Sequence, residues 1–463
     1  MKQQDILFRA RQVMPGGGLG DFHPDVVIRE GRGSRVWDED GNEYIDYLIG
    51  SGPMILGHGH PEVLEAVAEQ LSKGMTFFAQ NAASIELAEE ICKAVPCAEQ
   101  VRYVSTGTEA DMYAMRLARA FTHRDKIVKF EGGFHGMSAE AQMSLAPRSL
   151  ADFPVAVADS AGIPESVRGE VLIAPFNDAE FTRSLISKYA DQIAGIIVEP
   201  FQRIIPPAPG FLETLREECS RYGIVLIFDE IVTGFRFSYG GAQSVYDVVP
   251  DLCTLGKIIG GGLPLAAIAG RSDIMAHFDK NKVGAGQSVM QVGTLSGNPL
   301  AVAAGLKTLE ILQRPGQYEK LERTGQTLMQ GFVRCLKAAG HSAQSIGHPT
   351  LFDVVFSSGS VENYREVLLG NKDKAAHFNS TLRKNRILKI PGKFYISLAL
   401  TDAAYGACRG CVLICGIALD NQHFAIERFL SRKKIGGRAA AHSTANDYHI
   451  IARIHRADAT IVR

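Results

Sequence analysis

Apolar runs alternate with helical patterns through the middle of the chain. The runs "KIVKF", "EVLIAPF", "AGIIVEP" and "IVLIFDE" show no regular alternation of apolar and polar residues. Such strands are typical of a parallel sheet whose two faces are both covered by helices. Helical patterns near 179–190 and 210–222 separate the last three of these runs. We therefore predict an α/β fold with a mainly parallel central sheet.

The chain has different patterns before and after this region. Two alternating stretches flank Asp40-Gly41 in "SRVWDEDGNEYIDYL", which predicts a β-hairpin. A helical pattern begins at Pro61, and a long helix near Leu300 leads into a mixed α/β region. These changes predict two domains.

We expect the large domain to span residues 61–304. Residues 1–60 and 305–463 would together form a smaller α/β domain, in which 405–463 is an atypical tail.

Composition narrows the class of protein. The 463 residues are 46% hydrophobic and carry a formal net charge of -1, which gives no reason to expect nucleic acid or an anionic membrane as a partner. No apolar run approaches the roughly 20 residues of a membrane helix. The first residues lack the apolar core of a secretory signal, and the eight cysteines are scattered along the chain. We expect a cytoplasmic protein with neither a nucleic acid nor a membrane as a partner.

A hydroxyl-rich turn follows one predicted strand. In "VSTGTEADMYA" the strand ends at Ser105, and Thr106, Gly107 and Thr108 lead into a helix. Hydroxyls and free N–H groups at a helix N-terminus can bind phosphate. The same residues also suit an ordinary helix cap. Both interpretations stay open for this stretch alone.

Two charged residues stand beside apolar segments. Asp229 ends the run "GIVLIFD", at the strand end where open α/β sheets bind ligands. Lys257 lies in "TLGKIIGGGLP", and a desolvated lysine becomes a nucleophile toward carbonyls. Taken one at a time, each residue has an ordinary explanation. Asp229 could be an acidic strand end bonded to a loop, and Lys257 could be a lysine that reaches solvent. With a phosphate cradle, they are the three parts needed to hold pyridoxal 5'-phosphate.

Six motifs occur in the order and spacing of a known family: "STGTEA", "FEGGFHG", "IIVEP", "FDEIVTGFR", "TLGKIIGGGLP" and "GTLSGNPLA". Over roughly residues 8–402 the chain resembles the class III pyridoxal-phosphate-dependent aminotransferases, and within them most closely the glutamate-1-semialdehyde 2,1-aminomutase branch. The resemblance implies a fold-type I enzyme with pyridoxal 5'-phosphate as cofactor and no metal.

The resemblance also implies roles for the motif residues. Lys257 would hold the cofactor as a Schiff base, and Asp229 would salt-bridge its ring nitrogen; both would be catalytic. The cofactor's phosphate would bind at Thr106, Gly107 and Thr108. The glycines after Lys257 would leave room for the cofactor and for close packing at a dimer edge.

Further family positions surround the cofactor ring. Phe134 would stack on one face and Ile231 on the other, and Thr294 would reach the phosphate of the neighbouring subunit. This implies a homodimer with shared active sites. His135 and Glu199 match motif positions, where a structural role is as reasonable as a catalytic one.

The chain departs from the aminomutase pattern around the substrate. No arginine matches the usual carboxylate ligand in "PGGGLGDFHPD", and Ser51 stands where the branch has tryptophan. Arg203, in "EPFQRIIPPAPGF", could bind a carboxylate instead or form a structural ion pair, and Arg236 is a further candidate for either role.

These departures favour a ping-pong aminotransferase that acts on an amino donor and a 2-oxo acid acceptor. The donor would be an amino acid, bulky or of D- or β-configuration. An aminomutase, a racemase on the same scaffold and an inactive cofactor-binding protein are the alternatives.

The end of the chain differs from the rest. From Ala404 to Arg463 it has nine Lys/Arg and four Asp/Glu, with Cys408, Cys411 and Cys415 close together. A change of reading frame and a divergent native tail both remain open, and we expect no bound metal there.

Overall fold

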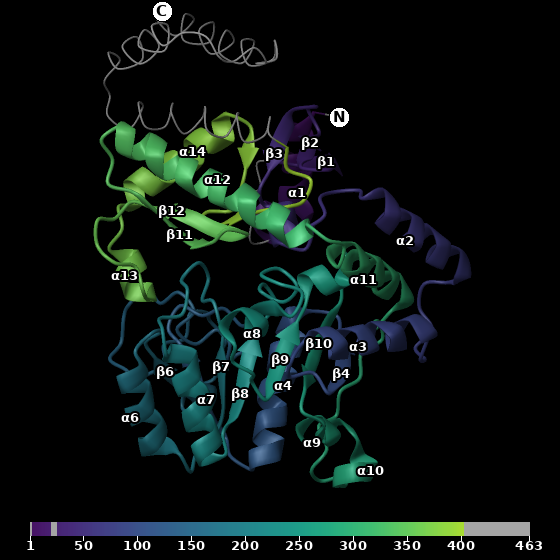
Figure 1. The fold of residues 1–463 in the computed structure, drawn as a ribbon, viewed down its shortest axis with the longest axis vertical. Coiled ribbons are helices and arrows are strands. Elements are labelled where there is room, and N and C mark those ends of the chain that lie inside the picture. The colour runs from purple at the N-terminus through teal and green to yellow at the C-terminus, as the bar shows by residue number, and fades with distance from the viewer. Residues whose placement is uncertain (1, 20–25, 402–463) are drawn as a thin grey trace, which may run out of the picture.

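A seven-stranded sheet forms the centre of the larger part of the molecule (Figure 1). The computed structural model describes residues 2–19 and 26–401, so the tail and its cysteines lie outside the described residues. The strand order is β4-β10-β9-β8-β7-β5-β6, and only β10 runs antiparallel to its neighbours within this sheet of the described chain. The prediction of an α/β fold with a mainly parallel sheet is confirmed. The strands are β4 (Gln100–Val104), β5 (Lys126–Phe130), β6 (Val171–Ala174), β7 (Ile193–Val198), β8 (Val225–Asp229), β9 (Leu252–Leu255) and β10 (Ala266–Gly270).

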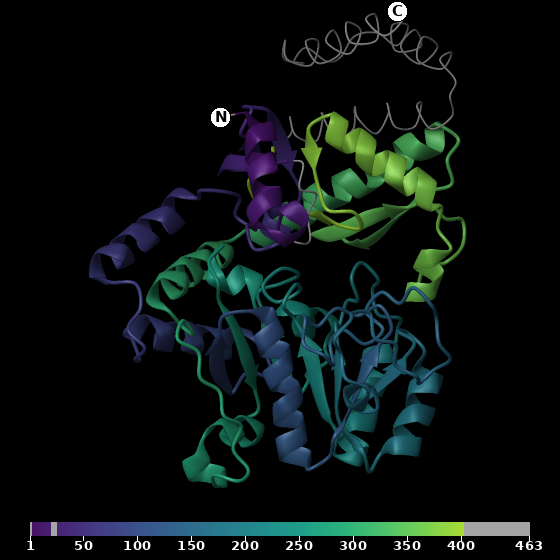
Figure 2. The same cartoon turned by 180° about the vertical axis from the view of Figure 1, so that it is seen from behind.

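Helices cover both faces of this sheet. The helices α6 (Ala179–Tyr189) and α7 (Phe211–Tyr222) lie in front of it in Figure 1, and α4 (Gly107–Thr122) lies in front of it in the reverse view of Figure 2. All six residues of β7 are buried. This double cover explains why the strands between the helices have no polar face.

The smaller part joins the two ends of the described chain. Its first sheet has the order β1-β2-β3-β13, and β13 pairs in parallel with β3 across more than 300 residues of sequence. The predicted hairpin is present as β2 and β3, with Gly41 at a φ of 80° between them. The strands are β1 (Ile28–Arg32), β2 (Arg35–Asp38), β3 (Glu43–Asp46) and β13 (Ile387–Leu388).

A second small sheet, β11-β12-β14, packs beneath the helix α12. Its members are β11 (Gln344–His348), β12 (Leu351–Val355) and β14 (Phe394–Tyr395), and the helices α12 (Gln317–Ala338) and α14 (Lys372–Lys384) belong to the same part. The ring of Phe394 stacks on Phe352 with centroids 5.2 Å apart and meets Tyr47 edge-on. This aromatic packing fixes the start of β14, which borders the cavity described below.

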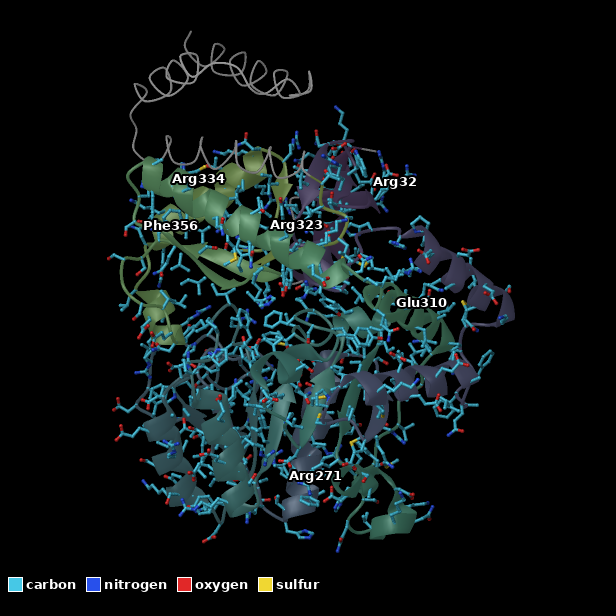
Figure 3. All side chains as sticks on the ribbon, viewed as in Figure 1. Arg32, Arg271, Glu310, Arg323, Arg334 and Phe356 are labelled. Atoms are coloured by element: carbon cyan, nitrogen blue, oxygen red, sulfur yellow. The ribbon has the colours of Figure 1, made fainter. Side chains whose placement is uncertain are left out.

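Helix α11 (Pro299–Leu312) packs against α2 (Pro61–Lys73) and α3 (Ala82–Ala94). Just beyond its end, Arg314 pairs with Glu62 of α2 and with Glu310, which is labelled on α11 in Figure 3.

At the opposite end of the central sheet, Arg271 (Figure 3) donates to Asp251 at 2.7 Å, far from the carboxyl ends of the parallel strands. The contact between Arg271 and Asp251 therefore supports the sheet and takes no part in the site.

The remaining elements are short or terminal. They are α1 (Gln3–Val13), η1 (Pro15–Gly17), η2 (Ile49–Ser51), α5 (Glu165–Arg168), α8 (Gly241–Tyr246), η3 (Lys257–Gly260), α9 (Ser272–Met275), η4 (Ala276–Phe278), α10 (Lys280–Val283) and α13 (Tyr364–Leu368). Within the described ranges, no helix has the length and apolar character needed to span a bilayer.

Candidate active site

A cavity of about 880 Å³ lies where the carboxyl ends of the parallel strands face the smaller part. The larger part contributes Thr106, Asp229 and Lys257 to its lining. The smaller part contributes residues before α2 and around β14, including Ser51, Lys393 and Tyr395. The structure thus brings the three predicted cofactor-binding elements into one cavity between the two parts.

Asp229 is the last residue of β8 and is buried. Its Oδ2 lies 2.8 Å from Nδ1 of His135, and its Oδ1 accepts a hydrogen bond from the N–H of Ile231 at 3.1 Å. Nε2 of His135 has no partner among the described residues. These contacts orient the carboxylate and offset the loss of its hydration.

A second buried carboxyl, Asp111, stands beside Asp229 and was missed from the sequence. It projects from α4, and its Oδ1 accepts a hydrogen bond of 2.6 Å from the hydroxyl of Thr254. Burial raises the pKa of Asp111 well above its usual value, and the neighbouring charge of Asp229 raises it further. We interpret Asp111 as the protonated member of this pair.

Asp111, His135 and Asp229 each place a potential ligand atom within 4.8 Å of the others. The hydrogen bonds from His135 and Thr254 already engage the carboxylates. We interpret the cluster as a hydrogen-bond network.

Lys257 begins the turn that follows β9 and has a φ of 49°, which is unusual for a residue with a side chain. Burial lowers the pKa of its amine. A Cβ added to Gly52 would lie 3.3 Å from Lys257 Cδ and 3.0 Å from Tyr395 Cε1, so glycine is needed between these side chains. The lysine is therefore held by a strained backbone and close packing.

The glycines after Lys257 have neighbours within the same chain. A Cβ on Gly261 would lie 2.5 Å from the carbonyl oxygen of Ala304 in α11, and one on Gly262 would lie 2.6 Å from Met54 Sδ. Both glycines have a positive φ. The contacts with α11 and Met54 require these glycines, and Gly262 also lines the cavity, so the expected room for a cofactor and packing at a dimer edge stay predictions.

The turn before α4 is a complete capping box. Thr106 Oγ1 accepts a hydrogen bond from the N–H of Glu109 at 3.2 Å, and Glu109 Oε2 accepts one from the N–H of Thr106 at 2.9 Å. Gly107 and Thr108 are the first two helical residues, so their N–H groups have no carbonyl partner within the helix. The helix-cap interpretation is correct for Thr106, while Gly107 and Thr108 keep the geometry of an anion site.

Phe134 and Ile231 also line the cavity. The N–H of Phe134 donates to Glu199 Oε2 at 2.9 Å, so Glu199 fixes the loop that carries the ring. Ile231 packs on Gly107 and Gly256, where added Cβ atoms would approach its side chain to 3.2 and 3.0 Å. Their roles at the faces of a cofactor ring stay predictions.

The substrate candidates differ in position. Ser51 and Arg203 line the cavity, both with a positive φ. The Arg203 guanidinium lies 5.3 Å from the centroid of the Phe134 ring and has no ion-pair partner in the part of the chain that the structure describes. No structural ion pair with a described residue therefore accounts for Arg203.

Three predicted residues do not line this cavity: His135, which reaches it only through Asp229, and Arg236 and Thr294. Arg236 is fully buried, donates to the carbonyl oxygen of Gly52 and lies over the Tyr395 ring. Burial lowers its pKa to about 10. Thr294 is exposed and does not line the cavity of its own chain. Arg236 thus supports the cavity wall, and the predicted contact of Thr294 with a partner subunit stays a prediction.

The residues present fit pyridoxal 5'-phosphate. The cavity holds an amine with a lowered pKa, a buried carboxylate kept in place by a histidine, and a helix N-terminus lined by glycine. A Cβ on Gly136 would lie 2.5 Å from Thr108 Oγ1, so the wall beside that helix end has no room for a side chain.

Comparison with known proteins shows the family of the chain. Residues 20–363 match the sequence model of the class III aminotransferases, and the chain belongs to this family. It is therefore a pyridoxal-phosphate-dependent transaminase, with an amino donor and a keto acid as its substrates.

Several solved structures are similar to the chain. An omega-transaminase from Sphaerobacter thermophilus is 34% identical, with a TM-score of 0.85 over 89% of this chain and 96% of that one. A beta-phenylalanine aminotransferase from Variovorax paradoxus is 30% identical, with a TM-score of 0.80 over 90% and 94%. A glutamate-1-semialdehyde aminomutase from Pseudomonas aeruginosa PAO1 shares the fold at 23% identity, with a TM-score of 0.80 over 89% and 93%.

Proposed function

We propose that this enzyme moves the amino group of an aryl-bearing β-amino acid to a 2-oxo acid. The observation that carries the proposal is Arg203, a guanidinium on the cavity wall with no carboxylate partner among the described residues. A planar guanidinium suits a substrate carboxylate. The 30% identity to a beta-phenylalanine aminotransferase supports this class of donor, as does the small Ser51 at the cavity wall.

The proposed chemistry assigns each group a task. Bound pyridoxal 5'-phosphate supplies an electron-withdrawing ring and carries the amino group between the two substrates. Lys257 would attach the cofactor and then, as a free amine, move the proton at the carbon that bears the amino group. Asp229, oriented by His135, would keep the ring nitrogen protonated. The N–H groups of Gly107 and Thr108 would bind the phosphate.

A donor and acceptor panel tests the function. The purified holoenzyme is assayed with both enantiomers of β-phenylalanine, D- and L-phenylalanine and 1-phenylethylamine, each with pyruvate and with 2-oxoglutarate. We expect the highest kcat/KM with one enantiomer of β-phenylalanine. Higher kcat/KM with an α-amino acid, or turnover of glutamate-1-semialdehyde without any acceptor, would refute the proposed donor.

The role of Arg203 has its own variants. Arg203→Met should raise KM for β-phenylalanine about tenfold or more with little change for 1-phenylethylamine, which has no carboxylate. Arg203→Lys should have a KM for β-phenylalanine between those of the wild type and Arg203→Met. Equal effects on both donors would refute carboxylate recognition by Arg203.

We also propose that the enzyme works as a homodimer. Large apolar side chains are exposed on two neighbouring segments, with Phe77 and Phe78 before α3 and Met290 and Val292 before α11. The segments meet where Asn81 Nδ2 donates to the carbonyl oxygen of Gly297 at 3.4 Å. Such a patch is typical of a protein interface, and it includes the exposed Thr294.

A mixing experiment tests the shared site. Lys257→Ala and Thr294→Arg should each lack activity, and refolding them together should restore up to about a quarter of it by forming mixed dimers with one intact site. Failure to restore activity, with dimers seen by sedimentation, would refute a shared site. The division at residues 60/61 and 304/305 and a cytoplasmic location also remain proposals, which limited proteolysis and cell fractionation can test.

A further inference from the structure

Lys393 is a buried lysine that the roles assigned above leave without a task. Its relative exposure is 7%, and it lines the cavity. Its ammonium group has neither a hydrogen bond nor an ion pair within residues 2–19 and 26–401. A buried cation without a partner is costly, so its retention points to an anion that is bound during function.

The backbone places this side chain firmly. Lys393 follows Pro391 and Gly392 in a tight turn, where its N–H donates to the carbonyl oxygen of Ile390 at 3.2 Å and Gly392 has a φ of 87°. The next residue, Phe394, is fixed by its stacking on Phe352. The amine is therefore held at the cavity wall by a turn and an aromatic anchor.

The surroundings of Lys393 are rich in positive charge. Burial, followed by the positive charge of Arg203, lowers the pKa of Lys393 to about 7. Arg236 lowers it slightly further, whereas Glu199 and Asp229 act in the opposite direction. Beside burial, the positive charge of Lys393 contributes to the lowered pKa of Lys257. The Tyr395 ring lies 5.9 Å from the amine of Lys393. A carboxylate placed near Lys393 and Arg203 would relieve this repulsion.

We propose that Lys393 and Arg203 together bind the carboxylate of the substrate, and that Lys393 takes up a proton from solvent as the carboxylate enters. The inference rests on the proposed function for the identity of the donor. Its chemistry applies equally to the carboxylate of a 2-oxo acid. Arg203 supplies a permanent charge from the larger part, and Lys393 supplies one from the smaller part only when an anion is present.

Binding of a carboxylate that cannot react tests the inference. The probe is 3-phenylpropanoate, titrated into the holoenzyme by calorimetry at pH 8 in two buffers of different ionisation enthalpy. The control probe is 3-phenylpropan-1-ol, which lacks the charge. An amine with a pKa of about 7 is mostly neutral at this pH, so binding should take up nearly one proton.

Three variants separate the possible causes. Lys393→Met should raise the Kd of 3-phenylpropanoate at least about tenfold, equivalent to about 1.4 kcal/mol, and leave the Kd of the alcohol unchanged. Lys393→Arg should retain binding but lose the proton uptake, because arginine stays charged. Lys320→Met is the matched control; this lysine donates to the carbonyl oxygen of Leu398 and does not line the cavity.

Stability distinguishes a functional lysine from a structural one. Because the ammonium group of Lys393 has no hydrogen bond or ion pair in the described chain, and only the distant Tyr395 ring as a neighbour, Lys393→Met should melt at or above the temperature of the wild type. A melting temperature well below that of Lys320→Met would overturn the inference, as would unchanged binding of 3-phenylpropanoate or equal loss of both probes. Proton uptake that persists in Lys393→Arg would overturn the protonation step.

The inference and the proposed function can fail separately. Carboxylate binding that depends on Lys393, without turnover of β-phenylalanine, would refute the donor and support the subsite. Turnover of β-phenylalanine with no effect of Lys393→Met on its KM would support the donor and refute the subsite. A wild-type holoenzyme that does not bind the probe would also refute the subsite.

Discussion

Replacing Asp111 by asparagine should make the cofactor-free protein more stable at neutral pH. In the wild type, the carboxyl oxygens of Asp111 and Asp229 approach within 4.8 Å in a buried site. Two unit charges at 4.8 Å repel by about 3 kcal/mol at an effective dielectric constant of 20. The raised pKa of Asp111 is the result of burial and of this repulsion. An asparagine keeps the shape and could donate to Asp229.

The sign of the effect follows from proton linkage. A carboxyl whose pKa is higher in the folded state binds more protons when folded, so its contribution to stability falls as the pH rises above its unfolded value of about 4. Asp111→Asn removes this loss. The difference in unfolding free energy between variant and wild type should therefore grow in favour of the variant as the pH rises from 4.5, toward a limit of a few kcal/mol.

Urea unfolding of the cofactor-free full chain at pH 4.5, 5.5, 6.5 and 7.5 measures this difference. Asp191→Asn is the matched control, because Asp191 is exposed and lies outside the cavity. Its curve should run parallel to that of the wild type. A parallel curve for Asp111→Asn, or a variant that is less stable than the wild type at pH 7.5, would refute the raised pKa of Asp111 in the folded protein.

Three further substitutions test the site and its support. Lys257→Ala should fold but lose both turnover and the cofactor's absorbance near the visible edge; an absorbance that survives would contradict the Schiff-base role. Thr106→Ala should lower the unfolding free energy by about 1 kcal/mol in urea, because the capping bond to Glu109 is lost, whereas Thr106→Ser should not. Gly305→Ala would normally stabilise a helix by about 1 kcal/mol. Here the new Cβ would lie 2.0 Å from the carbonyl oxygen of Ile259, so we expect a lower melting temperature and weaker cofactor binding. An unchanged melting temperature would contradict the expected clash between α11 and Ile259.

Much of the fold was predictable because its signals are local. The apolar runs predicted β5 to β8, and Asp40-Gly41 predicted the hairpin between β2 and β3. The antiparallel direction of β10 was not predictable, because its run of small apolar residues, "AAIAG", fits either direction. The parallel pairing of β13 with β3 joins segments too distant in sequence for any local pattern to reveal.

The site was predicted in part for the same reason. Asp229 and Lys257 follow strands, where residue type and position coincide, and both line the cavity. Asp111 was missed because it lies within a helix, although an aspartate in the apolar pattern of "EADMYAMRLARAF" was a usable signal. Lys393 was missed because its importance depends on tertiary burial, and its only trace in the sequence is a lone lysine after Pro391-Gly392.

The cavity draws its walls from two parts of the molecule. Asp229, Lys257 and the N-terminus of α4 come from the larger part, whereas Ser51, Lys393 and Tyr395 come from the smaller one. The groups proposed for proton transfer thus come from the larger part, whereas the proposed substrate contacts come from both parts, with Arg203 from the larger one and Lys393 from the smaller one. Substitutions in the segments 49–53 and 390–395 should change which amines are accepted without disturbing the proton transfers, except at Gly52, where an added Cβ would press on Lys257. These two short segments are where we would begin to engineer a new donor.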